Sequence, residues 1–203
     1  MYIPKSYQEQ DEHKLIEFMQ VHNFATLISS ANNIAIATHL PFVIEKRNGK
    51  LILVSHMAKA NPQCQSFLEN ELLTIFHGPH AFISPKHYEK QQNVPTWNYI
   101  AVHAYGKATV IDKQEDVINL MERTIHFFEK EFYPQWKNLS PEYIHGMLKA
   151  IVAFEIEVTK IDGQYKLSQD KTKKEQQTII SAFEKSNDSV QLEVANEMKK
   201  NLE

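Results

Sequence analysis

Apolar residues follow two different periods in the first part of the chain. Between residues 11 and 22 they recur every three or four positions, which predicts an amphipathic helix. Residues 24–29 and 34–44 are instead rich in β-branched and aromatic side chains and predict two strands, with a hairpin turn at residues 31–33. Pro41 predicts an edge or a bulge in the second strand. The run Lys50–Ser55 is dense in Leu, Ile and Val, which predicts a third strand buried on both faces.

The next segment combines a helix start with two further strands. Asn61 supplies a capping side chain and Pro62 lacks an amide hydrogen, so together they predict a short helix that continues to about Asn70. Residues 72–76 then have strand composition, and residues 97–111 have it again after a proline-containing loop.

Two capped helices are predicted in the following segment. Asp112 and Glu115 have the spacing of a capping box, and the helix after them carries an apolar stripe that we expect over the end of a sheet. The stripe consists of Val117, Met121, Ile125, Phe128 and Phe132. Ser140 and Pro141 mark the start of the second helix.

The C-terminal third returns to strands before it becomes helical. Residues 154–158 alternate apolar and acidic side chains, which predicts a strand with one wet face, and Asp162–Gly163 predicts a turn into residues 165–167. From Lys171 onward the apolar spacing indicates one or two amphipathic helices. Their apolar face needs a cover, which is either the chain's own barrel or a second subunit.

This order of elements predicts a mainly β protein with flanking helices. An antiparallel barrel with helices at its ends accounts for it better than a doubly wound fold, since no glycine-rich nucleotide loop follows any predicted strand. We expect residues 1–170 to form one domain and residues 171–203 to form a C-terminal helical extension.

Composition and charge narrow the function classes. No apolar run approaches the roughly 20 residues that span a bilayer, and the first residues lack the apolar stretch of a secretion signal, so we expect a cytoplasmic protein with no membrane partner. The single Cys64 excludes an intrachain disulfide. The formal net charge is −3 with the basic residues dispersed, which gives direct DNA binding no support. The one dense basic cluster, residues 171–174, is interpreted as a solvated lysine face rather than a phosphate site.

Four segments give the chain a specific resemblance. They are residues 37–41 (ATHLP), 56–63 (HMAKANPQ), 76–84 (FHGPHAFIS) and 94–106 (VPTWNYIAVHAYG). In this order and spacing the chain resembles the PaiB family of negative transcriptional regulators, from about Met1 to Lys171. The resemblance implies an antiparallel split β-barrel related to pyridoxamine-phosphate oxidases and flavin reductases. It also implies a homodimer with flavin mononucleotide (FMN) between subunits, and repression of degradative-enzyme and sporulation genes.

FMN needs donors for its phosphate and apolar walls for its ring system. The segment from Ser55 to Asn61 lies between a buried strand and a predicted helix start, which is a favourable anion site. We therefore expect Ser55, His56, Lys59 and Asn61 to bind the phosphate end. The alternative is that Asn61 only caps the helix and Lys59 is solvated.

Six further residues are predicted to contact the cofactor. Thr38 and His39 precede the kink expected at Pro41, and the resemblance implies that their strand lies along the flavin ring. A buried histidine bonded to a backbone carbonyl is the alternative for His39. Trp97 and Asn98 combine an aromatic surface with an amide, although packing is the commoner role of such residues. The remaining two candidates, Ser168 and Gln169, belong to a YKLSQ segment that is part of the resemblance.

Neither a metal nor a catalytic residue is assigned. His77 and His80, with His87 as a third ligand, have a spacing that permits chelation, but a sharp turn at Gly78–Pro79 explains the same residues. Cys64 has no identifiable partner that would activate it as a nucleophile.

Three functions follow from these observations. The leading hypothesis is a regulatory flavoprotein that represses genes through DNA, a small molecule or a partner protein. The second is an FMN-dependent oxidoreductase, because the implied fold is also used by enzymes. The third retains the dimer with an empty cofactor site.

Overall fold

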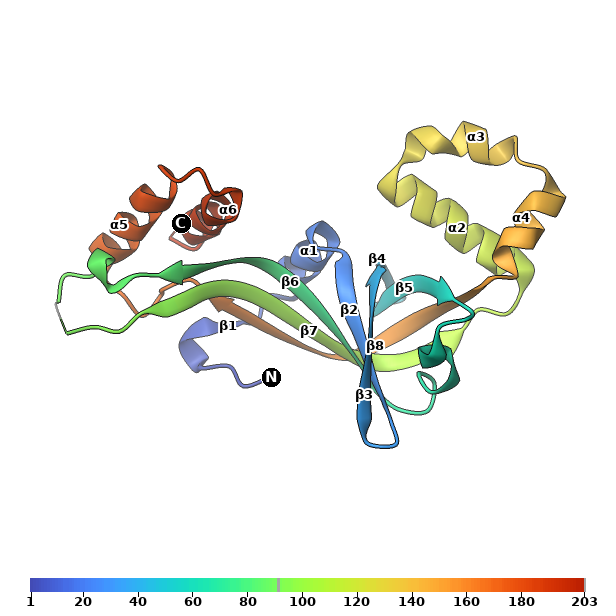
Figure 1. The fold of residues 1–203 in the computed structure, drawn as a ribbon, viewed down its shortest axis with the longest axis horizontal. Coiled ribbons are helices and arrows are strands. Elements are labelled where there is room, and N and C mark those ends of the chain that lie inside the picture. The colour runs from blue at the N-terminus through green and yellow to red at the C-terminus, as the bar shows by residue number, and fades with distance from the viewer. Residues whose placement is uncertain (91, 203) are drawn as a thin grey trace. The chain divides into compact units, whose positions relative to one another are not determined.

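The computed structural model describes residues 1–90 and 92–202 and contains an eight-stranded sheet flanked by helices (Figure 1). The sheet follows the order β3-β2-β6-β7-β8-β5-β4, and β1 pairs with β8. Each strand pair whose register is resolved is antiparallel, as predicted. The strands are β1 (Gln8–Glu9), β2 (Phe24–Ala31), β3 (Ile34–Pro41), β4 (Val43–Arg47), β5 (Lys50–Ala58), β6 (Leu72–Ile83), β7 (Thr96–Val110) and β8 (Ile151–Lys166).

The helices lie between and after these strands. The α-helices are α1 (Glu12–Val21), α2 (Gln114–Phe128), α3 (Tyr133–Lys137), α4 (Pro141–Leu148), α5 (Lys173–Phe183) and α6 (Ser189–Lys200). Four short 3-10 helices complete the fold: η1 (Lys5–Tyr7), η2 (Pro62–Gln65), η3 (Pro85–His87) and η4 (Lys130–Phe132). Within the described chain, no helix is both long and apolar enough to cross a membrane.

The chain forms two compact units. The first consists of residues 1–18, 77–103 and the chain from Asp162 onward, and the second consists of residues 19–76 and 104–161. Strands β6, β7 and β8 contribute one segment to each unit. The two ends of the sheet path, β3 and β4, are not paired with each other in the described residues, so the sheet is open in the manner of a split barrel.

The first unit buries the apolar face of the C-terminal helices. Thr172 and Glu175 form a capping box at the start of α5, which fixes where this helix begins. The covered side chains are Ile179, Ile180, Phe183, Val194 and Met198. The chain itself therefore covers these five side chains, whereas Val190 on the same tail is exposed.

The second unit places α2 over strands β4, β5 and β8. Val117 and Leu120 on α2 pack against Ile52 and Val54 on β5 and against Ala153 on β8. This packing confirms the expectation that the helix covers the sheet.

The apolar stripe of α2 is shorter than predicted. Phe128 is exposed, and Phe132 lies in the separate helix η4. The capping box predicted at Asp112 and Glu115 is wrong, because the residue before the helix is Lys113 and no side chain caps it.

Two predicted turns are continuous strand instead. Asp162–Gly163 lies within β8, where a Cβ on Gly163 would stand 2.2 Å from Leu15 Cδ2. Gly78–Pro79 lies within β6, where a Cβ on Gly78 would stand 2.7 Å from the Phe18 ring. Both glycines provide room for the close packing of an apolar side chain rather than a change of chain direction.

Two element boundaries also differ from the prediction. The helix expected from Pro62 to Asn70 is the four-residue η2, which ends at Gln65. The strand expected over residues 34–44 is divided at Phe42, whose buried ring packs edge-on against Phe76 and Phe154. Burying this ring in the core interrupts the strand.

Candidate functional site

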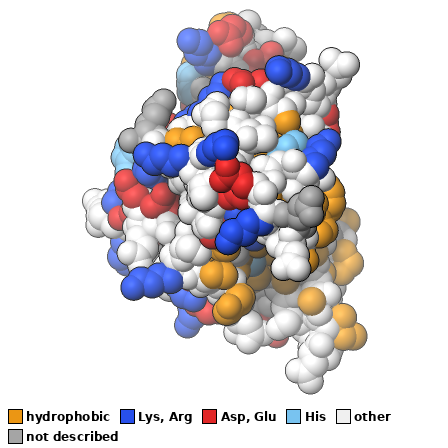
Figure 2. Space-filling model, turned by 90° about the vertical axis from the view of Figure 1, so that its left-hand side faces the viewer, with side chains coloured by type: hydrophobic (Ala, Val, Ile, Leu, Met, Phe, Trp, Pro, Cys, Tyr) orange, Lys and Arg blue, Asp and Glu red, His pale blue; other side chains and the backbone are white. Residues whose placement is uncertain are grey.

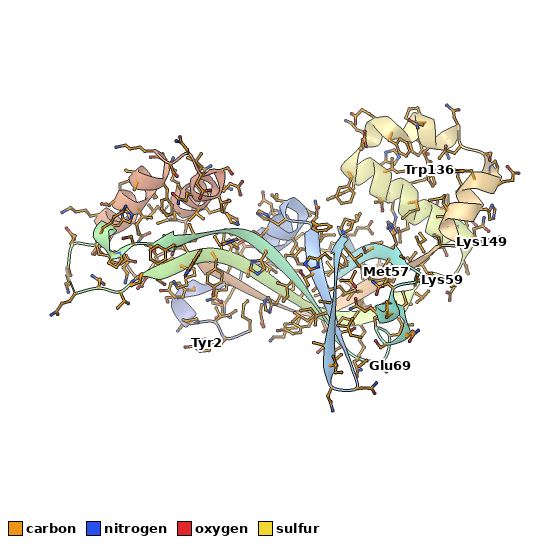
Figure 3. The ribbon with its side chains drawn as sticks, in the orientation of Figure 1. Tyr2, Met57, Lys59, Glu69, Trp136 and Lys149 are labelled. Atoms are coloured by element: carbon orange, nitrogen blue, oxygen red, sulfur yellow. The ribbon has the colours of Figure 1, made fainter. Side chains whose placement is uncertain are left out.

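The connection between β5 and η2 carries two of the predicted phosphate-binding residues, Lys59 and Asn61, and β5 itself carries Ser55 and His56. The Lys59 amide donates to the Ala150 carbonyl at 2.8 Å, and the Asn61 amide donates to the Ala58 carbonyl at 2.9 Å. The Lys59 side chain is exposed at the end of β5 (Figure 3). The backbone is therefore fixed while the ammonium group remains accessible.

Asn61 joins this connection to strand β3. Its Oδ1 accepts from the Gln63 amide at 2.9 Å, which caps η2, and its Nδ2 donates to Thr38 Oγ1 at 2.9 Å. The structure thus brings two predicted site residues, Thr38 and Asn61, into direct contact. Because η2 has only four residues, its amides add little to an anion site, and the charge must come from side chains.

Thr38 and His39 point to opposite faces of β3, since neighbouring strand residues alternate. Thr38 faces Asn61, whereas the exposed His39 lies beside Phe24 with ring centroids 6.4 Å apart. His39 is not the buried, carbonyl-bonded histidine of the alternative interpretation. The two residues cannot contact the same side of one ligand.

Ser55 and His56 diverge in the same way along β5. Ser55 is buried and its hydroxyl donates to the Pro41 carbonyl at 2.7 Å. His56 is half-buried opposite Ala153, and burial lowers the pKa of its imidazole. Ser55 thus ties β5 to the end of β3, and His56 is a neutral side chain at ordinary pH.

Lys149 joins this region and was missed from the sequence. It precedes Ala150, whose carbonyl accepts the Lys59 amide, so the backbones of the two lysines are adjacent. Figure 3 shows both lysines in the same region, and both are exposed. Among the described residues neither ammonium group has an ion-pair partner. No motif links positions 59 and 149, because only the β5–β8 pairing brings them together.

The other four predicted residues lie in the first unit, around the start of β7. Trp97 is half-exposed, and its ring contacts His80 and Phe82 at centroid distances of 6.1 and 6.0 Å. Asn98 is fully buried instead. Its Oδ1 accepts from the Ser168 hydroxyl at 3.0 Å, and its Nδ2 lies 3.4 Å from the Met198 sulfur.

Ser168 and Gln169 shape the turn after β8. Ser168 has a φ of 64°, a left-handed conformation that is uncommon for a residue with a side chain. Gln169 accepts from the Leu167 amide at 2.7 Å and donates to the Tyr165 carbonyl. These bonds fix the turn that leads to α5, while Trp97 is the one predicted residue of this unit with an exposed ring.

The histidines considered for a metal lie in the same unit. His77 and His80 are both on β6 with ring centroids 6.5 Å apart, whereas His87 packs against Phe183. Across residues 1–90 and 92–202, no group of three or more His, Cys, Asp or Glu side chains is arranged to hold a metal ion. Burial raises the pKa of the Cys64 thiol, which disfavours the nucleophilic thiolate.

Comparison with solved structures identifies the fold class to which this chain belongs. The flavocytochrome Anf3 from Azotobacter vinelandii matches with a TM-score of 0.64 at 11% identity, over 81% of this chain and 72% of its own. An FAD and heme binding protein from Mycobacterium smegmatis matches with a TM-score of 0.58 at 14% identity, over 79% and 73% of the two chains. The fold is that of the flavin-binding split barrels.

Sequence comparison gives the family. Residues 1–160 match the family model described as "Putative FMN-binding domain". The Bacillus subtilis protein named protease synthase and sporulation protein PAI 2 is 37% identical over 91% of this chain and 89% of its own. The protein AN0679 from Emericella nidulans is 28% identical over 73% of this chain and 74% of its own. The chain belongs to the PaiB family of FMN-binding split-barrel proteins.

The residues of the second unit fit the phosphate end of FMN. Lys59 and Lys149 provide two exposed ammonium groups without ion-pair partners, as a dianionic phosphate requires. Asn61 follows Lys59 by two positions in the chain, and its amide nitrogen donates to the Thr38 hydroxyl at 2.9 Å. The donor set thus suits a phosphate, with the lysines as its charged members.

Proposed function

We propose that this protein is an FMN-binding negative transcriptional regulator of degradative-enzyme and sporulation genes. The observation that carries the proposal is the 37% identity to the Bacillus subtilis protein PAI 2 over nearly the whole length of both chains. The match extends through all four motif segments on which the family resemblance rests.

The proposed phosphate site uses exposed residues of the second unit. In the second unit Lys59 binds the FMN phosphate with Lys149, and the Thr38–Asn61 pair lies beside them as a further donor set. In the first unit the exposed ring of Trp97 is a separate aromatic surface. When bound, FMN supplies the redox chemistry, and the chain supplies binding and orientation.

Ser55 positions this site, because it holds β5 against the end of β3. In the first unit Asn98 and Ser168 hold the start of β7 against the turn after β8. We further propose a cytoplasmic homodimer in which residues 1–170 form the FMN-binding domain and residues 171–203 the helical extension.

The charge distribution supports regulation through a ligand or a partner protein over direct DNA binding. The formal net charge is −3, and acidic and basic side chains interleave on the face shown in Figure 2. Proteins that bind DNA strongly usually gather Lys and Arg on one face, because phosphate contacts dominate their affinity.

A titration against DNA tests which mechanism of repression applies. The purified protein is titrated against target promoter DNA and random DNA of equal length, at two salt concentrations. We expect no shift that depends on salt, since the phosphate contacts would have to come from clustered basic residues. A promoter-specific, salt-dependent complex would contradict regulation through a ligand or partner and would establish a direct repressor.

The second candidate function is an FMN-dependent oxidoreductase. The observation in its favour is the shared fold with the flavocytochrome Anf3, at a TM-score of 0.64. Anaerobic mixing of the FMN-loaded protein with NADH or NADPH distinguishes the two functions. Loss of the flavin's visible absorption supports a reductase, and an unchanged spectrum supports the regulator.

A further inference from the structure

Three polar side chains of the second unit are buried together against strands β2 and β6. Ser29 is 3% exposed, and Gln63 and Thr74 are fully buried. Thr74 on β6 lies directly opposite Leu27 on β2, so its side chain is on the same face of the sheet as those of Leu27 and Ser29. Gln63 reaches this face from η2, because its Nε2 donates to Ser29 Oγ at 3.0 Å. Ser29, Gln63 and Thr74 therefore form one buried polar cluster.

The hydrogen bonds of this cluster satisfy one end of the Gln63 amide. Its Nε2 has the Ser29 hydroxyl as an acceptor and, at 3.3 Å each, the carbonyls of Leu27 and Ile36. Among the described residues, neither Gln63 Oε1 nor Thr74 Oγ1 has a hydrogen-bond partner. Proteins rarely leave a buried polar atom unpaired, because the atom has lost its hydrogen bonds to solvent. Two such atoms in one cluster indicate a further group that pairs with both.

The chemistry of these atoms restricts what that group can be. Gln63 Oε1 can only accept a hydrogen bond, whereas the Thr74 hydroxyl can donate one. The Ser29 hydroxyl accepts from Gln63 and can donate its own hydrogen. The cluster contains no charged side chain, and an ion buried without a counter-charge is strongly disfavoured. The missing group must therefore be small and neutral, and it must both donate and accept.

We propose that Gln63, Thr74 and Ser29 bind one internal water molecule. The water donates to Gln63 Oε1 and accepts from the hydroxyls of Thr74 and Ser29. Internal water molecules typically make about three hydrogen bonds to buried polar groups, which is the number that this cluster offers. The bound water joins η2 to both β2 and β6.

This water would support the part of η2 that holds the candidate phosphate site. The Gln63 amide donates to Asn61 Oδ1, and Asn61 in turn donates to Thr38 on β3. The Gln63 side chain also bonds to the Ile36 carbonyl on the same strand. Gln63 is thus a positioning residue for the Thr38–Asn61 pair. This consequence rests on the proposed function, whereas the water site rests on the buried cluster alone.

The variant T74V tests the water site by the sign of its effect on stability. Valine keeps the shape of threonine and removes only the hydroxyl. If Thr74 binds the water, T74V removes one of its partners, and we expect the unfolding equilibrium constant in urea denaturation to rise about tenfold. If the Thr74 hydroxyl has no partner, its removal relieves an unfavourable burial, and the constant falls.

The matched control is T26V. Thr26 is half-buried and neighbours Leu27 on β2, so its side chain lies on the opposite face of the same pair of strands. The same substitution there should change the unfolding constant about twofold or less. A crystal structure of the wild-type protein adds a direct observation, in which we expect one ordered water molecule within about 3 Å of both Gln63 Oε1 and Thr74 Oγ1.

Three results would overturn the proposal. They are a T74V variant at least as stable as wild type, an equal loss of stability in T26V, and a crystal structure in which Gln63 Oε1 and Thr74 Oγ1 bond directly to each other or to the chain. FMN is titrated into the same samples. A wild-type protein that holds the water but takes up no FMN would contradict the proposed function and leave the water site in place.

Discussion

At the scale of single residues, Asn61 and Lys59 belong to the same sequence motif but have different structural roles. Asn61 uses both ends of its amide to hold η2 and β3, whereas the Lys59 ammonium has no ion-pair partner within the described chain. In the proposed site Asn61 therefore mainly positions its neighbours, and Lys59 is the residue that would supply charge to the phosphate.

Replacing Lys59 should weaken FMN binding without changing the fold. We expect K59A to lower the affinity for FMN about tenfold, because a charge-assisted hydrogen bond contributes ~1.5 kcal/mol or more. Equilibrium titration of FMN fluorescence measures the change. The matched control is K50A, since Lys50 is an exposed lysine at the start of β5, the strand that Lys59 follows, and it pairs with Glu157. Equal affinities of K59A and wild type would remove Lys59 from the site.

His56 should make the stability of the protein depend on pH. Burial lowers the pKa of His56 in the folded protein, so the unfolded chain takes up a proton first as the pH falls. The stability that comes from keeping His56 neutral is fully present above the ordinary histidine pKa of about 6.5. It is lost as the pH falls below that value toward the lower pKa of His56 in the folded protein. The free energy of unfolding is measured by urea denaturation at pH 7.5 and at pH 5.5. Its decrease between the two pH values should be smaller in H56Q than in wild type. An equal loss in both would contradict the burial of His56.

The candidate site was predictable in its residue types but not in its geometry. The HMAKANPQ segment indicated Lys59 and Asn61, and both lie at the end of a buried strand as expected. The sequence did not separate Thr38 from His39, although the two-residue period of a strand already places neighbours on opposite faces. Lys149 could not be found, since long-range strand pairing alone brings it to Lys59.

At the scale of elements, local signals predicted the strands and helices well and their ends less well. The helix α1, the first hairpin, β5 and the start of α4 all lie where periodicity and caps placed them. The errors occur where tertiary packing overrides a local turn or helix signal. Gly163 is the clearest case, because the Asp-Gly pair is a strong turn signal yet lies in a strand against Leu15.

The close packing of strands β7 and β8 in the second unit allows a specific prediction about stability. A Cβ at Gly106 on β7 would lie 2.3 Å from the Glu157 carbonyl oxygen, whereas a Cβ at Gly146 in α4 would meet nothing within 4 Å. We expect G106A to lower the free energy of unfolding by about 1–3 kcal/mol, because backbone must shift. G146A should raise it by about 0.5–1 kcal/mol, since alanine favours the helix.

Chemical denaturation of both variants measures these differences. The pair serves as its own control, because the same substitution is made twice in one unit and only the surroundings differ. A G106A variant as stable as wild type would contradict the close approach of β7 and β8.

At the scale of the whole molecule, the open antiparallel sheet with flanking helices is the part of the account that the sequence predicted best. The order of predicted strands and helices, the hairpin signals and the lack of a glycine-rich nucleotide loop after any predicted strand indicated this fold, together with the family resemblance. Fold and family both indicate a flavin-binding protein.

Equilibrium titration of the purified protein with FMN tests the central claim most directly. We predict saturable binding of FMN to the protein, with a shifted visible absorption spectrum and altered flavin fluorescence, and co-elution of flavin and protein in gel filtration. An unchanged flavin spectrum, together with complete separation of flavin from protein, would contradict the account.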